Sequence, residues 1–229
     1  SITEIEYRIG ELEGRETIAS ISKRKRNGVY YTPEPVVTYL VEESLQPWFA
    51  RARIAAGWPD ASIAPSGEAL AAYRERLSAI TIVDPACGSG AFLIAAFRCL
   101  LDERLAVEHH LAALSGRAVI GPDVERQLIA SILESNIYGV DINPASVEIS
   151  KLALWLHSAR AGAPLSGLDG RIVCGNSLVD HSIWLGRPEP DEAMRDRINS
   201  FDWREAFPEV FEHGGFDIVV GNPPYVKLQ

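Results

Sequence analysis

Asp84-Pro-Ala-Cys-Gly-Ser-Gly-Ala-Phe-Leu93 is the stretch that decides the fold of this chain. An apolar run at residues 80–83 precedes it and predicts a buried strand, and a helical pattern follows from about residue 91. A strand, a tight glycine turn and a helix start are typical of the opening of a nucleotide-binding α/β domain. Gly88 and Gly90 would let the backbone pass close to a ligand. Such turns also occur for structural reasons alone, so that interpretation stays open here.

Composition limits the class of protein. The chain has 229 residues, 47% of them hydrophobic, which suits one large α/β domain, with or without an extension. No apolar run approaches the ~18 residues that span a bilayer, and no signal peptide is visible, so no membrane contact is expected. Three widely spaced cysteines form no metal or redox pair, which indicates the cytoplasm. With a net charge of −9, either nucleic acid is not the substrate, or the basic binding surface is local or lies outside this chain.

Strands and helices alternate along the sequence. The expected strands are residues 80–83, 136–141, 171–174 and 216–220, and the expected helices are residues 34–49, 68–77, 91–114, 124–133 and 145–157. Residues 180–215 are expected to be irregular, with short helical pieces. The alternation predicts a parallel sheet with helices on both faces, in the strand order third, second, first, fourth.

The amino-terminal part is divided into residues 1–27, a polar extension, and the start of a core domain that covers residues 28–229. The basic run at residues 23–26 is either a solvated linker or an arm that contacts phosphates. Thr32 is the expected N-cap of the first core helix, with Pro33 at its first position. The apolar stripe of that helix is expected to consist of Val37, Leu40, Val41 and Leu45.

Four polar residues follow the ends of the expected strands: Asp84, Asp141, Asn176 and Asn222. Ligands of open α/β sheets bind at the carboxyl ends of the strands, so these side chains would line one crevice. An acidic residue at the position of Asp141 bonds ribose hydroxyls in doubly wound folds, although an N-cap or a surface carboxylate is the alternative. Ile142 would pack on an adenine ring. The absence of a Walker lysine disfavours a triphosphate.

Three motifs in this order resemble the S-adenosylmethionine-dependent DNA adenine-N6 methyltransferases: residues 84–93, Gly139-Val-Asp-Ile-Asn143 and Asn222-Pro-Pro-Tyr225. Tyr30-Tyr-Thr-Pro33, ahead of the glycine turn, is similar to the gamma arrangement of type IIG and related restriction-modification methylases. The resemblance implies a Rossmann-like, doubly wound, mostly parallel sheet of the class I methyltransferases. It also implies that this sheet is truncated after its fourth strand and carries an N-terminal helical extension.

The resemblance assigns nine residues to S-adenosylmethionine: Tyr30, Thr32, Asp84, Ala86, Gly88, Gly90, Asp141, Ile142 and Asn176. Tyr30 and Thr32 would approach the methionine end of the cofactor, and Asp141 would hold its ribose hydroxyls. Asn176 would meet the adenine amino group. Many family members have Asp at that place, and an amide oxygen can accept the same hydrogen bond.

The last motif suits an exocyclic amine as the methyl acceptor. Such an amine is a poor nucleophile because its lone pair is delocalised into the ring. The Asn222 side-chain oxygen and the Pro223 carbonyl could accept its two N–H groups and return electron density to the nitrogen. Pro223 and Pro224 remove backbone donors and stiffen the turn, and Tyr225 offers a π face to an extruded base. A rigid turn without function is the alternative.

Two other functions stay open. One is methylation of another planar amide or amine, as in the release-factor glutamine methyltransferases or on an RNA base. The other is a non-catalytic scaffold that binds the cofactor. Under the leading hypothesis the intact protein acts on a flipped adenine in double-stranded DNA, through a target-recognition region absent from these residues. The chain alone is then expected to lack specific activity and to self-associate through its fourth strand.

Overall fold

The structure is a computed structural model that describes residues 32–60, 62–116, 120–158, 168–185 and 191–223. All of these except Pro223 belong to one unit, Thr32–Asn222. The expected extension at residues 1–27 lies outside the described residues. So do Tyr30, Pro224 and Tyr225.

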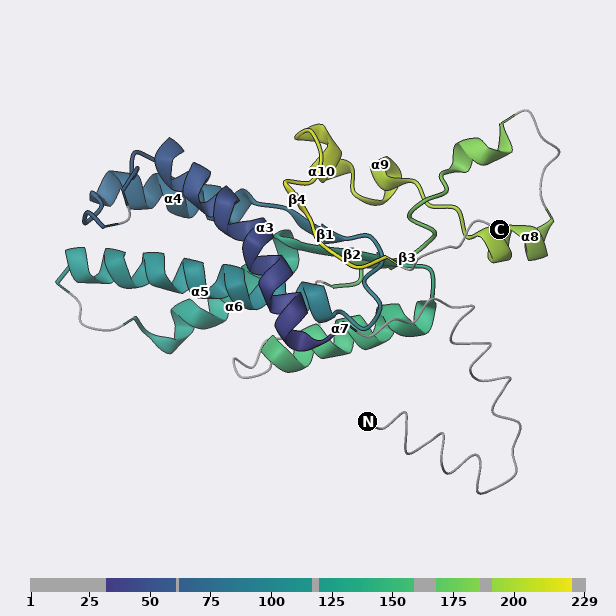
Figure 1. Cartoon of the computed structure of the whole chain (residues 1–229), viewed down its shortest axis with the longest axis horizontal. Coiled ribbons are helices and arrows are strands. Elements are labelled where there is room, and N and C mark those ends of the chain that lie inside the picture. The colour runs from purple at the N-terminus through teal and green to yellow at the C-terminus, as the bar shows by residue number, and fades with distance from the viewer. Residues whose placement is uncertain (1–31, 61, 117–119, 159–167, 186–190, 224–229) are drawn as a thin grey trace, which may run out of the picture. The chain divides into compact units, whose positions relative to one another are not determined.

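Four parallel strands form one sheet in the order β3-β2-β1-β4, which confirms the predicted topology (Figure 1). The strands are β1 Ile82–Asp84, β2 Ile137–Asp141, β3 Ile172–Cys174 and β4 Ile218–Val219. This arrangement is the Rossmann-like α/β fold that the sequence predicted.

Each strand begins one or two residues later than expected. At the start of β1, side chains make the hydrogen bonds that a longer strand would make with its neighbours. The Thr81 amide donates to the Asp217 carboxylate at 2.9 Å, and the Ile80 carbonyl accepts from the Asn136 side chain at 2.6 Å. Ile80 is fully buried beside the sheet, and the Thr81 carbonyl still accepts from the Ile218 amide at 3.1 Å.

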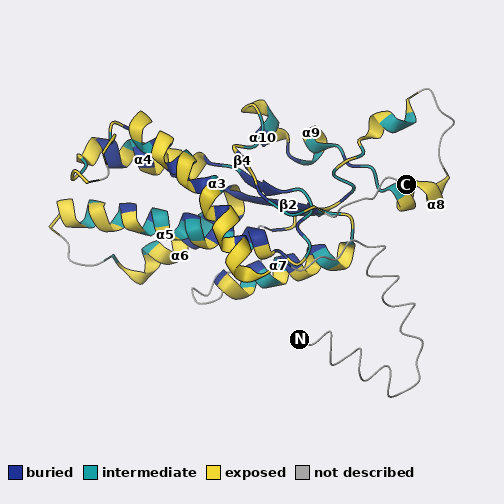
Figure 2. Cartoon of the chain, viewed as in Figure 1, coloured by how far each residue is buried: buried dark blue, intermediate teal, exposed yellow. Residues whose placement is uncertain are grey.

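Helices α5 Ala91–Leu114, α6 Pro122–Ser135 and α7 Pro144–Ser158 pack on one face of the sheet. Helices α3 Glu34–Ala55 and α4 Gly67–Ala79 pack against α5 on the same side. Ile82 of β1 lies opposite Ile137 on one side and opposite Ile218 on the other, and all three side chains enter the core beneath these helices. Figure 2 shows the helices buried where they meet the sheet and exposed on their outer sides.

The second face is covered mainly by aromatic side chains on short elements. The short helices that carry them are α9 Trp203–Ala206 and α10 Pro208–Glu212. The other short elements of this region, η2 His181–Trp184 and α8 Glu192–Ile198, have no buried residues. Val83, Tyr138 and Val140 alternate with the isoleucines and point to this face, as the two-residue period of a strand requires. The Tyr138 ring meets both Phe207 and Phe216 edge-on, with centroids 5.2 Å apart in each pair. The short helical pieces expected over residues 180–215 are present, and aromatic side chains give this face the cover that longer helices give the other.

Helix α3 corrects three predictions. Its N-cap is Pro33 and not Thr32, and no side chain caps it. It continues through Pro47 to Ala55, beyond the expected end at residue 49, because Phe49 and Ala52 are also buried against the core. Leu40 is 41% exposed, since the buried residues form a row spaced mostly by four. That row consists of Val37, Val41, Leu45, Phe49 and Ala52.

Asn136 is fully buried just before β2 and joins three elements. Its amide nitrogen donates to the carbonyls of Ser78 at 3.1 Å and of Ile80 at 2.6 Å, at the end of α4. Its oxygen accepts from the guanidinium of Arg104, a buried residue of α5, at 3.2 Å. One side chain thus satisfies three buried polar groups at the amino end of the sheet.

We expect Asn136→Ala to lower the free energy of unfolding by about 2–4 kcal/mol, because it leaves buried carbonyls and a buried guanidinium without partners. Chemical denaturation measures this change. Gln127→Ala, which removes an exposed amide from α6, is the control and should stay within about 0.5 kcal/mol of wild type. A loss below about 1 kcal/mol at Asn136 would contradict the role given to its side chain.

Candidate functional site

At the carboxyl ends of the strands, the turn after β1 contacts the end of β2. The Cys87 amide donates to the Val140 carbonyl at 3.0 Å, and the Gly88 amide donates to the Asp141 carboxylate at 2.8 Å. The glycine turn and the acidic residue that the sequence singled out therefore form one connected edge, as parallel pairing of β1 and β2 requires.

The two glycines of the turn have different surroundings. Gly88 has a φ of +54°, and a Cβ placed on it would meet no atom within 4 Å, so this position faces open space. Gly90 has a φ of +85° and precedes α5, but a Cβ there would lie 3.1 Å from the Ser150 hydroxyl of α7. Ser150 also donates to the Gly88 carbonyl at 2.7 Å. Helix packing thus accounts for Gly90 without a ligand, whereas Gly88 leaves room for one.

Two backbone amides hold the Asp141 carboxylate in place. One oxygen accepts from Gly88, and the other accepts from the Asn143 amide at 2.8 Å. Each carboxylate oxygen can accept a further hydrogen bond. Ile142 follows directly and is 49% exposed. The pair therefore offers an acceptor and an apolar surface side by side.

Asp84 is almost fully buried beneath the same edge, with 1% of its surface exposed. Burial raises the pKa of its carboxyl to about 7, the nearby Asp141 charge adds to this, and the hydrogen bond from the half-buried Ala86 amide opposes it. The chain after β4 passes directly over this group. A Cβ on Gly221, which has a φ of +153°, would lie 2.6 Å from the Asp84 carboxyl oxygen.

Asn176 lies two residues beyond β3 and is fixed by the loop ahead of α9. Its amide nitrogen donates to the Ile198 carbonyl at 3.1 Å, and its oxygen accepts from the Leu178 amide at 3.3 Å. Its backbone amide donates to the Asn199 carbonyl at 2.7 Å. The oxygen keeps a second lone pair, so it can still accept the hydrogen bond expected from an adenine amino group.

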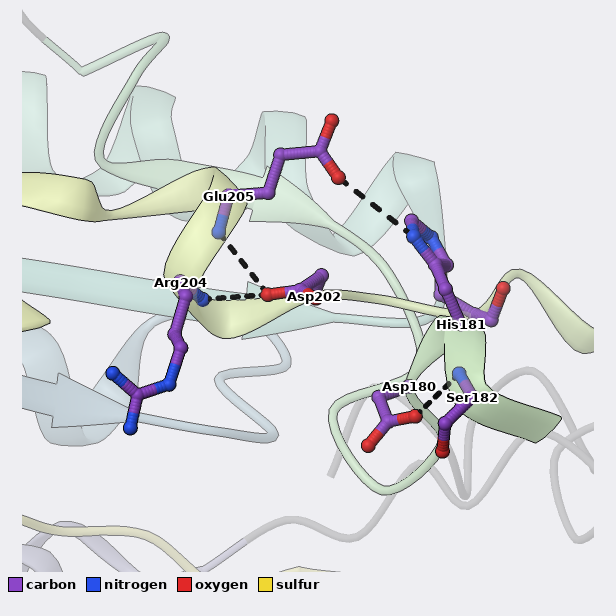
Figure 3. Close-up of polar contacts among 7 residues, drawn as sticks. Asp180, His181, Ser182, Asp202, Arg204 and Glu205 are labelled. Carbon is purple, nitrogen blue, oxygen red and sulfur yellow. Dashed lines mark hydrogen bonds and ion pairs between the residues drawn. The ribbon is translucent and has the colours of Figure 1, made fainter. Parts of the chain in front are cut away.

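Acidic side chains after β3 and before α9 act as caps (Figure 3). Asp180 accepts from the Ser182 amide at 2.6 Å, and Asp202 accepts from the amides of Arg204 and Glu205. His181 lies between the two loops, with one ring nitrogen 3.2 Å from the Ser200 carbonyl and the other 3.7 Å from the Glu205 carboxylate. These contacts tie the loop after β3 to the segment ahead of β4.

Thr32 and Asn222 meet although 190 positions separate them. The Asn222 amide nitrogen donates to the Thr32 hydroxyl at 3.2 Å. The first residue of the described chain and the residue that follows β4 by three positions thus share one hydrogen bond. This contact replaces the helix-capping role that the sequence suggested for Thr32.

Sequence reasoning did not find Ser150 and Gly221, which shape the edge. Gly221 precedes Asn222 directly, so its place in the motif was a usable signal, whereas nothing local marks Ser150 within α7. Within the described ranges, no group of three or more His, Cys, Asp or Glu side chains is arranged to hold a metal ion. None of the described helices is long and apolar enough to span a bilayer.

Comparison with known proteins supports the resemblance inferred from the motifs. Residues 135–229 match the family described as Eco57I restriction-modification methylase. The chain is 31% identical over 182 residues to a protein of Methanocaldococcus jannaschii that is provisionally described as a type II restriction enzyme and methyltransferase. That alignment covers 68% of this chain and 15% of the relative. The resemblance to gamma-type adenine methyltransferases is confirmed.

Two further relatives carry related descriptions. The adenine-specific methyltransferase PglX of Streptomyces coelicolor is 27% identical over 224 residues, which are 92% of this chain and 16% of the relative. The type II restriction enzyme and methyltransferase RM.Eco57I of Escherichia coli is 27% identical over 157 residues, which are 64% of this chain and 14% of the relative. The chain therefore spans no more than 16% of the length of these three relatives.

The buried carboxyl predicts how stability depends on pH. The folded chain keeps the Asp84 proton up to about pH 7, against an ordinary pKa of 3.8, so the stabilisation from the neutral carboxyl is complete below about pH 4 and is lost as pH rises to 7. Asp84→Asn removes this loss. As pH rises from 4 to 8, we expect the unfolding free energy of Asp84→Asn minus that of wild type to increase by about 2–4 kcal/mol.

Denaturant titrations at five or six pH values measure this difference. Asp102→Asn, which removes one exposed carboxyl from α5, is the matched control for the loss of a charge. A difference between Asp84→Asn and wild type that stays constant over the whole pH range would show that the carboxyl is not held neutral.

Proposed function

We propose that this chain is the catalytic part of a cytoplasmic enzyme that transfers a methyl group from S-adenosylmethionine to the exocyclic N6 amine of adenine in DNA. The enzyme would serve a restriction-modification or phage-defence system. The observation that carries the proposal is the position of the Asn222 amide, held by Thr32 at the strand edge that also holds Gly88 and Asp141.

The edge fits an adenosyl cofactor. Asp141 presents oriented carboxylate oxygens for ribose hydroxyls, and exposed Ile142 offers a surface for an adenine ring. The open space beside Gly88 lets the backbone approach the ligand closely. When bound, S-adenosylmethionine supplies an electrophilic methyl group on a sulfonium centre. We assign the remaining contacts to Tyr30 and Thr32 at the methionine end, and to Asp84, Ala86, Gly90 and Asn176.

The chain's own part in the transfer is to prepare the acceptor amine. The Asn222 oxygen and the Pro223 carbonyl accept the two N–H groups, which directs the nitrogen lone pair away from both acceptors. No Ser, Cys or His nucleophile is needed, because rate comes from orientation and from preorganised acceptors. Pro224 keeps the turn rigid, and Tyr225 stacks on the extruded base.

The choice of DNA as substrate rests on the relatives. Their descriptions name restriction enzymes and an adenine-specific methyltransferase. A net charge of −9 does not favour a phosphate backbone, so we place most DNA contacts in other parts of the intact protein. Base extrusion from double-stranded DNA also requires those contacts, because it costs a few kcal/mol that the core must recover. We retain residues 28–229 as the methyltransferase core, preceded by an extension at residues 1–27.

Nucleoside mass spectrometry on DNA incubated with the intact protein and S-adenosylmethionine tests the proposal. We expect N6-methyladenine with wild type. Asn222→Ala should lower its formation at least ~100-fold while leaving cofactor affinity nearly unchanged, because the amide acts on the target amine. Gln127→Ala on α6 is the control and should match wild type. Finding 4-methylcytosine, or a methylated release factor beside unmodified DNA, would overturn the assignment.

A further inference from the structure

We infer that Thr32 is a positioning residue for the transfer: its hydroxyl holds the Asn222 amide with the oxygen turned toward the methyl-accepting amine. The inference rests on the proposed function and deepens it. The resemblance placed Thr32 beside the cofactor, and the local sequence suggested a helix cap. Its contact with Asn222 points to a third role.

In the structure, the contact holds the amide with its nitrogen toward the Thr32 hydroxyl. An amide nitrogen can only donate and an amide oxygen can only accept. With the nitrogen bonded to the Thr32 hydroxyl at 3.2 Å, the Asn222 oxygen is left without a hydrogen-bond partner among the described residues. The reversed orientation would turn two N–H donors toward an amine that itself presents N–H groups. Only the observed orientation therefore provides an acceptor.

The Thr32 end of this contact is anchored by α3. The Pro33 carbonyl accepts from the amides of Val36 at 2.9 Å and Val37 at 3.1 Å, which fixes the first turn. Val37 and Val41 are 2% and 1% exposed and hold that turn against the core. Thr32 therefore lies one residue before the N-cap of a helix that packs along α5, which limits its movement.

The Asn222 end is anchored by β4. The Val220 amide donates to the Val83 carbonyl at 2.9 Å, which continues the pairing with β1. A Cβ on Gly221 would lie 2.6 Å from the Asp84 carboxyl oxygen, so a larger residue there would force a shift. With both backbones fixed, the rotation of the Asn222 side chain is the remaining freedom, and the Thr32 hydroxyl restricts it.

Single-turnover methyl transfer at saturating S-adenosylmethionine tests the inference in the intact protein. Thr32→Val keeps the shape but removes the hydroxyl, and we expect the rate to fall about threefold to tenfold, the range that one net hydrogen bond gives. Thr32→Ser keeps the hydroxyl and should restore the rate to within about twofold of wild type. Thr38→Val makes the same change at an exposed position of α3 and should leave the rate unaltered. If the valine variant does not fold, Thr32→Ala replaces it.

Repeating the Thr32→Val substitution in an Asn222→Ser variant distinguishes positioning of the amide from a general loss of stability. In Asn222→Ser the amide is gone, so adding Thr32→Val should change the residual rate less than twofold. An equal fall in both backgrounds, or a wild-type rate for Thr32→Val, would overturn the inference while the proposed function stands. A wild-type protein that forms no N6-methyladenine would overturn both.

Discussion

The pairing of β1 with two neighbours is the constraint on which the rest of the structure depends. Ile82 lies opposite Ile137 on one side and Ile218 on the other, so β1 fixes the register of both. A slip of one residue would turn the isoleucines toward the aromatic face and expose the opposite set. The same register sets which residues reach the carboxyl edge. Core packing and the composition of the site are thus determined together.

At the carboxyl ends of the strands, two carboxyl groups and a conformationally restricted segment of backbone lie close together. Asp141 is oriented by two amides, and Asp84 lies buried beneath, with its pKa raised by burial and by that neighbouring charge. A cationic ligand would lower the cost of ionising Asp84, and the sulfonium cofactor of the proposed reaction is a cation. Gly221 presses the chain after β4 onto the same carboxyl. The proposed cofactor and acceptor sites therefore share one buried group.

Local patterns were enough to predict the sheet order and the polar residues at the strand ends. A short apolar run followed by Gly, Asp or Asn indicates a buried strand that ends in a turn. Contacts distant in sequence were not predictable in this way. Thr32 looks like a helix cap from its neighbours, yet its hydroxyl bonds Asn222. The motif marks Gly90 for the cofactor, and nothing in the sequence indicates that Ser150 of α7 also packs against it. The aromatic layer over the second face also escaped prediction, because Phe201, Phe207 and Phe216 lie in short irregular segments without a period.

Hydrogen exchange followed by mass spectrometry, with and without S-adenosylmethionine, tests the central claim that the strand ends form one binding edge. The account predicts slower exchange in peptides covering residues 84–93 and 139–143, since the Gly88 and Asn143 amides both bond Asp141. Both peptides should become protected over the same range of S-adenosylmethionine concentration, and the exchange of peptides from α6 should not change. Protection of only one of the two, or protection confined to α6, would contradict the account.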